Sequence, residues 1–149
     1  MNSPNEELNL YILIPEYSLV STPQKTVIDE KLLLDWGARI GLAAKQEEID
    51  STQLENLIAS LDAVEGRAAL LATAAFALRQ AKRLRKGGMT AKIASQALLD
   101  LYDKNLDKEQ ARKMLRFAKW VYEAIDKLPG DLRPERVTLE ELLRRLAGR

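Results

Sequence analysis

The sequence predicts an all-α protein: a single-domain helical bundle of five to six helices with a short extended N-terminal arm. Two observations lead to this fold class. From residue 29 to residue 149, apolar side chains recur at three- and four-residue spacing, and capping residues or glycines separate the periodic segments. Residues 1–28 lack that periodicity. We therefore expect an arm over residues 1–28 and the bundle over residues 29–149.

The arm contains two short apolar runs, Leu10–Ile14 and Tyr17–Val20, which are stopped by Pro15 and Pro23. Because proline cannot continue a helix, these prolines exclude one helix through the region. An extended arm lying on the bundle is favoured over a short hairpin. Its tyrosines and isoleucines also suit contact with a neighbouring subunit.

The first helix is expected over Glu30–Gln46, with Asp29 as its N-cap. Gly37 and Gly41 lie four residues apart, and each weakens this helix relative to alanine. Because small residues at that spacing usually mark a close contact between helices, we expect a neighbouring helix to come close here. Asp50 or Ser51 then caps a second, peripheral helix. Its single apolar stripe consists of Leu54, Leu57, Ile58 and Leu61.

The segment Val64–Lys86 is expected to form the central helix. From Ala68 to Leu78 almost every side chain is apolar, on all faces of a helical wheel. A helix without a polar face must be surrounded by other elements. Gly87 and Gly88 are expected to end it, because glycine readily adopts the left-handed conformation that follows a helix.

Three further helices follow, each preceded by a capping residue. Thr90 is expected to cap the fourth helix. Asp107 and Gln110 have the spacing of a capping box ahead of the fifth helix, Lys108–Leu128. Thr138 and Glu141 have the same spacing at the start of a last short helix.

The composition argues against catalysis. The 149 residues include no cysteine and no histidine, so thiolate chemistry and imidazole chemistry are both absent. We expect no enzyme activity, no cofactor and no metal; a small carboxylate- and metal-dependent enzyme is the remote alternative. No apolar stretch approaches the ~20 residues that span a bilayer, so we expect no membrane association and a cytoplasmic location.

Positive charge is arranged in two rows, although the net charge is only +1. One row closes the central helix, and the other follows the fifth helix from Lys108 onward. Cations spread along a track neutralise successive phosphates, so both rows are candidate nucleic-acid contacts. A solvated surface is the alternative, and Trp120, Phe117 and Tyr122 are expected in the core. The candidate residues are Arg79, Lys82, Arg83, Lys86, Arg112, Lys113, Arg116 and Lys119.

Three segments between Leu33 and Asp126 resemble the small helical subunit of type III-A (Csm-type) CRISPR-Cas effector complexes. Asp50–Leu57 is similar to the family's threonine-serine-glutamine-isoleucine-arginine helix start, although Glu55 stands at the arginine position. The alanine-rich helix ending in Arg79, with Phe76 near an aromatic position, resembles the next family helix. Arg116–Ile125 resembles a late helix with an aromatic residue and a glutamate-alanine-isoleucine sequence. A small subunit of a related CRISPR effector, type I or another type III branch, would fit the resemblance almost as well.

The resemblance implies a non-catalytic subunit that stacks in copies inside a guide-RNA filament. There it would contact the backbone of the target RNA, or of a displaced strand, without reading its sequence. The implied partners are guide RNA, target RNA, other effector subunits and further copies of the chain. The alternative function is a helical protein–protein interaction module without a direct nucleic-acid role, in which the N-terminal arm is the adhesive element.

Overall fold

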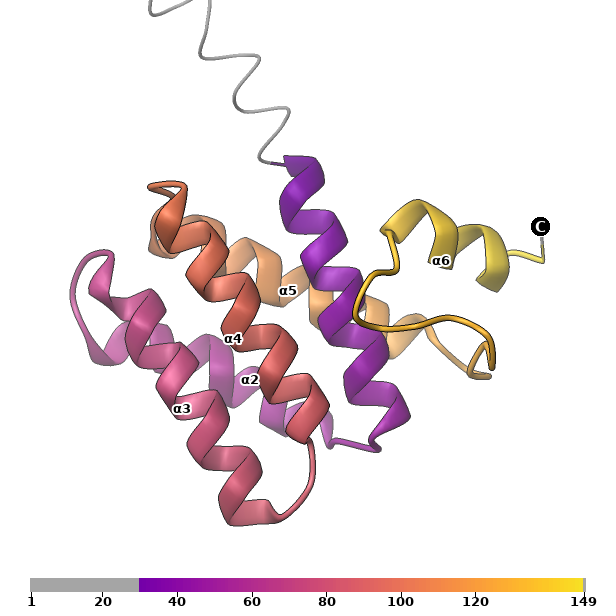
Figure 1. Cartoon of the computed structure of the whole chain (residues 1–149), viewed down its shortest axis with the longest axis horizontal. Helices are drawn as coiled ribbons and strands as arrows, with labels where there is room; N and C mark the ends of the chain where they lie inside the picture. Colours follow the sequence, from indigo (N-terminus) through magenta and orange to yellow (C-terminus); the bar gives the residue numbers. More distant parts are fainter. Residues whose placement is uncertain (1–29, 149) are drawn as a thin grey trace, which may run out of the picture. The chain divides into compact units, whose positions relative to one another are not determined.

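A computed structural model describes residues 30–148 of the chain. These residues form six α-helices and no strand, which confirms the all-α prediction. The predicted arm and Asp29 lie outside the described residues. The first helix covers residues 30–46. The helices that follow are α2 (Ser51–Ser60) with the 3₁₀ turn η1 (Leu61–Ala63), α3 (Ala68–Leu84), α4 (Gly88–Asp103), α5 (Lys108–Ala124) and α6 (Leu139–Leu146) (Figure 1).

The helix starts follow local capping chemistry in three cases. Asp50 caps α2 by accepting a hydrogen bond from the backbone N–H of Thr52. Complete capping boxes open α5, through Asp107 and Gln110, and α6, through Thr138 and Glu141. The sequence prediction of these starts is confirmed.

The start of α4 differs from the prediction. Gly87, with φ +84°, is the N-cap, and Thr90 lies inside the first turn. The carboxylate of Glu47 accepts hydrogen bonds from the backbone N–H groups of Met89 (3.0 Å) and Thr90 (2.7 Å) and from the Thr90 hydroxyl. A carboxylate that is distant in sequence thus satisfies the free N–H groups and complements the helix dipole.

Two helices also end earlier than expected. The left-handed residue after α3 is Arg85, with φ +60°, so the helix stops at Leu84, before the two glycines. The helix α5 stops at Ala124, because Ile125 has extended backbone with ψ 110°.

The first helix packs closely against α5 at its two glycines. A Cβ atom on Gly37 would lie 2.8 Å from the Phe117 Cβ, and one on Gly41 would lie 2.6 Å from the Ala118 carbonyl oxygen. Those distances leave no room for a methyl group, so the predicted close approach is confirmed. The neighbouring core continues into the C-terminal segment. It contains Ala38, Leu42, Val121, Ile125, Leu132, Val137 and Leu142.

The prediction that the third helix is central and surrounded is wrong. The side of α3 that faces α2 and α4 is buried, including Leu70 and Ala77, but Leu71 is 39% and Leu78 is 51% exposed. In Figure 1, α3 and α4 run side by side in opposite directions, with α2 and α5 behind them. The reason lies in the composition: seven of the seventeen residues of α3 are alanine. A small methyl side chain exposes little apolar area, so a helix can be apolar all round without being covered.

Candidate nucleic-acid interface

The end of α3 carries cations that no other group among residues 30–148 engages. Arg79, Lys82, Arg83 and Lys86 are all exposed, and in the described residues none of their side chains makes a hydrogen bond or an ion pair. Arg79, Lys82 and Arg83 project away from the buried side of α3, which includes Ala77. Lys86 follows the end of the helix and lines a hollow with Ile49 and Gln53. Within the described part of the chain, these charges are not neutralised by neighbouring acids.

Arg85 joins this group, although it is not among the residues predicted from the sequence. It falls between Lys82 and Lys86 but off their helical row, and its left-handed conformation turns the chain at the end of α3. It is exposed and makes no ion pair within residues 30–148. In the sequence, only the basic composition around Arg85 indicated that it belongs with the other cations. Its position after the helix was not predictable, because the helix was expected to end at Gly87 and Gly88. We call these five residues the α3 cation cluster: Arg79, Lys82, Arg83, Arg85 and Lys86.

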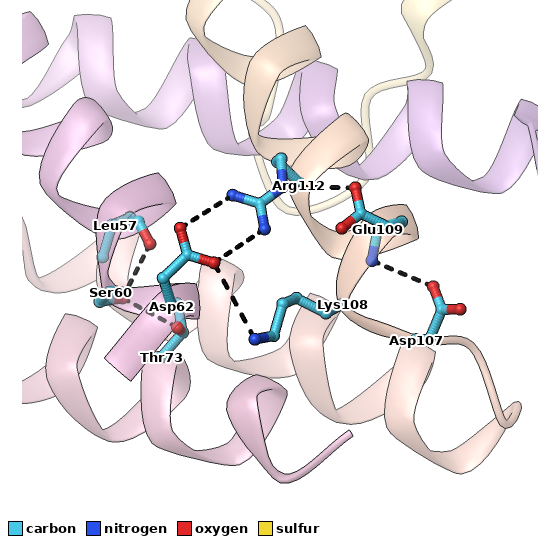
Figure 2. A network of polar contacts seen from close by, with 8 residues as sticks. All are labelled: Leu57, Ser60, Asp62, Thr73, Asp107, Lys108, Glu109 and Arg112. Carbon is cyan, nitrogen blue, oxygen red and sulfur yellow. Dashed lines mark hydrogen bonds and ion pairs between the residues drawn. The ribbon is translucent and has the colours of Figure 1, made fainter. Parts of the chain in front are cut away.

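The row on α5 has a different environment, because α2 and η1 lie along it. The Arg112 guanidinium donates to the Asp62 carboxylate at 3.0 Å and to Glu109 at 3.4 Å, and Lys108 lies 3.9 Å from Asp62 (Figure 2). Lys119 lies 2.6 Å from the Glu55 carboxylate and 3.6 Å from that of Glu123. These acids neutralise much of the row.

The titration of these groups is shifted by the same contacts. The hydrogen bond from Arg112 lowers the pKa of Asp62 below its ordinary value, and the reciprocal bond raises the pKa of Arg112. The Glu55 carboxylate raises the pKa of Lys119. Each shift favours the charged form, so the ion pairs persist around neutral pH.

Arg116 is the member of the α5 row that remains exposed and without an ion pair in residues 30–148. It lines a groove of ≈ 410 Å³ between α2 and α5. Acids from α2 and η1 line the groove with it, so the groove has no strong net charge. Lys113 is not in this row; at 100° per residue it projects to another side of α5.

Trp120 lies at the same groove and is 64% exposed, so the expectation that it belongs to the core is wrong. Its ring contacts that of Phe117, with 5.6 Å between centroids. Phe117 and Tyr122 are half-buried, and the Tyr122 hydroxyl donates to the Ile49 carbonyl oxygen. The two rows predicted from sequence therefore lie in different surroundings. The helix α2 packs against both α3 and α5.

The part of the chain that the structure describes contains neither a cluster of metal-ligating side chains nor a helix that could span a membrane. Among residues 30–148, no three side chains of the metal-ligating types come together. No helix in that range has both the length and the apolar character to cross a membrane. No protein-family model, curated protein or solved structure matches the chain.

Proposed function

We propose that the chain is a non-catalytic subunit that holds the backbone of a single-stranded RNA through the α3 cation cluster. The single observation that carries the proposal is the state of these five side chains. They are exposed and make no ion pair in the described residues, whereas Arg112 and Lys119 on α5 are bound to acids of the same chain. Cations without internal partners gain most from an external polyanion.

The surrounding sequence strengthens the local field. No aspartate or glutamate occurs between Glu65 and Asp100, a stretch that covers all of α3 and most of α4. Within the same stretch, the Arg67 guanidinium donates hydrogen bonds to the carbonyl oxygens of Tyr102 and Leu106, so Arg67 does not belong to the cluster. A chain whose total charge is +1 thus concentrates positive potential at one helix end.

Sequence-independent binding follows from the kind of side chain. Lysine and arginine contact phosphate oxygens, which are the same at every nucleotide. The choice of RNA, and of a role within a CRISPR effector complex, rests on the resemblance of residues 33–126 to the small subunits of those complexes.

The test measures the affinity of the full chain for two labelled single-stranded RNAs of unrelated sequence and about 20 nucleotides. The variant Arg79→Gln/Arg83→Gln/Lys86→Gln removes three cluster charges. The control variant Lys127→Gln/Arg133→Gln/Arg136→Gln removes three exposed charges, none in an ion pair within residues 30–148, from the segment between α5 and α6. Both variants have the same net charge, so the comparison separates position from total charge.

We expect the cluster variant to bind both RNAs about tenfold more weakly or worse and the control to stay close to the wild type. Equal losses in the two variants would show diffuse attraction rather than a site. Unchanged binding in the cluster variant would overturn the proposal and favour the protein–protein interaction module.

A further inference from the structure

The outward side of the α3–α4 pair carries apolar side chains that are exposed in the described structure. On α3, Leu71, Ala75 and Leu78 are exposed at helical spacing i, i+4 and i+7. On α4, Leu99 is 46% exposed. Contiguous apolar side chains on a surface of this kind mark an interaction site more often than isolated ones do.

Both sets of side chains lie on the same side of the pair. The helices α2 and α5 lie behind α3 and α4 (Figure 1). On the helical wheel, the exposed side chains of α3 and α4 are opposite to the buried ones. The Ser95 hydroxyl donates to the Ala91 carbonyl oxygen within α4 at 2.8 Å, and its longer hydrogen bond to the Ala74 carbonyl oxygen, at 3.4 Å, marks the register of the two antiparallel helices. Leu71 on α3 and Leu99 on α4 each lie about one turn from this bond, at the same level of the pair.

Charges at the two ends of this surface have opposite signs. Lys92, Gln96, Leu99 and Asp103 follow one another on α4 at spacing i, i+4, i+7 and i+11, and all are exposed. Lys92 thus stands at one end of the row and Asp103 at the other, about 16 Å apart along the helix axis. Neither makes an ion pair within residues 30–148. We name the surface the α3–α4 face; it consists of Leu71, Ala75, Leu78, Lys92, Gln96, Leu99 and Asp103.

We propose that a second copy of this chain occupies the α3–α4 face, in an antiparallel contact with two-fold symmetry. A two-fold axis near Ala75 and Gln96 would place the leucines of one copy against those of the other. The same rotation would bring Asp103 of each copy toward Lys92 of its partner. In an isologous interface every contact occurs twice, so a surface with an acid at one end and a base at the other complements itself.

A parallel arrangement of the same faces would place like charges opposite each other at both ends. An acidic partner protein would place its acidic side chains against Asp103, which carries the same charge. The second copy is the occupant that satisfies both ends and the apolar centre. This inference does not rest on RNA binding. On the helical wheel, Arg79 and Arg83 point to the side of α3 away from α4, so the dimer would leave them accessible. Lys82, at i+11 from Leu71, lies at the Lys92 end of the α3–α4 face.

The experiment is sedimentation velocity of the RNA-free full chain over a concentration range of about 2 to 200 µM, since an apolar contact of this size gives a weak dimer. We expect the mass to rise from 16.8 kDa toward twice that value. The variants Leu71→Asp/Leu78→Asp and Leu99→Asp should remain monomeric. The control Leu143→Asp alters an equally exposed leucine on α6, at 49%, and should dimerise like the wild type.

A second set of variants tests the symmetry. Lys92→Glu and Asp103→Lys should each weaken dimerisation about tenfold, and the double variant should recover it, because the swapped charges again face each other. Circular dichroism verifies that each variant folds. A wild type that stays monomeric, or leucine variants that still dimerise, would overturn the proposal. Monomeric leucine variants without charge-swap recovery would overturn the antiparallel arrangement.

Discussion

Gly41 fixes the distance between the first helix and α5, because an added methyl group would lie 2.6 Å from the Ala118 carbonyl oxygen and 2.9 Å from the Val121 Cβ. We predict that Gly41→Ala lowers the free energy of unfolding by about 1–2 kcal/mol. The cost of overpacking exceeds the roughly 1 kcal/mol that alanine gains in helix propensity. Urea unfolding of the variant and the wild type measures the difference.

Gly88→Ala is the matched control, since the same change there meets no atom within 4 Å. It should be neutral or slightly stabilising, by up to about 1 kcal/mol. Equal effects at the two glycines would show that propensity, and not the space between the helices, determines the result.

The ion pair at Asp62 gives a pH prediction at the same scale. Arg112 lowers the pKa of this carboxyl in the folded protein, so the pair stabilises the fold above the unfolded pKa of about 3.9 and loses its effect as the pH falls through the folded value. We predict that Asp62→Asn is less stable than the wild type at pH 7 and that this difference shrinks toward about pH 3. Urea unfolding at both pH values measures it.

Asp126→Asn provides the comparison, because Asp126 is exposed and makes no ion pair in the described residues. Its stability difference from the wild type should change little over the same pH range. An Asp62 effect that grew toward acid would contradict the assigned direction of the shift.

Single residues also show what the sequence can and cannot predict. The close approach at Gly37 and Gly41 was predictable, because small residues four apart on a helix are typical of a close contact between helices. The pairing of Arg112 was not, because its partner Asp62 lies 50 residues away and is placed by η1. Trp120 was misassigned for a related reason: a residue at the border of an apolar stripe is buried only if a neighbour covers that border.

Among the elements, α3 shows that an apolar side chain in an apolar helix is not always buried. Leu70 is fully buried, whereas its neighbour Leu71 is 39% exposed. We predict that Leu70→Ala lowers the free energy of unfolding by about 2–5 kcal/mol and that Leu71→Ala lowers it by less than about 1 kcal/mol. Thermal or urea unfolding of the wild type and the two variants measures both losses.

The pair is its own control, because both variants make the same chemical change at adjacent positions of one helix. If α3 were surrounded, as the sequence alone indicated, the two losses would be similar. Similar losses would therefore contradict the position of α3 in the structure.

The helices themselves were largely predictable, and their ends less so. Capping boxes are local, and those at Asp107 and Thr138 open α5 and α6 as expected. The start of α4 depends on Glu47, which approaches from another helix end, and no local pattern around Thr90 records that contact. Local sequence patterns thus predicted which segments form helices. Contacts between distant segments determine where some of these helices begin and which of their sides are buried.

For the whole molecule, a net charge of +1 conceals strong segregation. Basic side chains on α5 are largely matched by acids of α2 and η1, whereas the α3 cation cluster has no such partners in residues 30–148. The α3–α4 face adds an apolar surface beside that cluster. Charge pairing within the fold therefore distinguishes the two rows that looked equivalent in the sequence.

The most direct test of the central claim is the salt dependence of RNA binding by the wild type and by Arg79→Gln/Arg83→Gln/Lys86→Gln. Each phosphate contact on a single strand contributes about 0.7 to the slope of log affinity against log salt concentration. Three contacts at the cluster predict a slope about 2 smaller in the variant, for any RNA sequence. Identical slopes would contradict the claim that these cations hold the backbone.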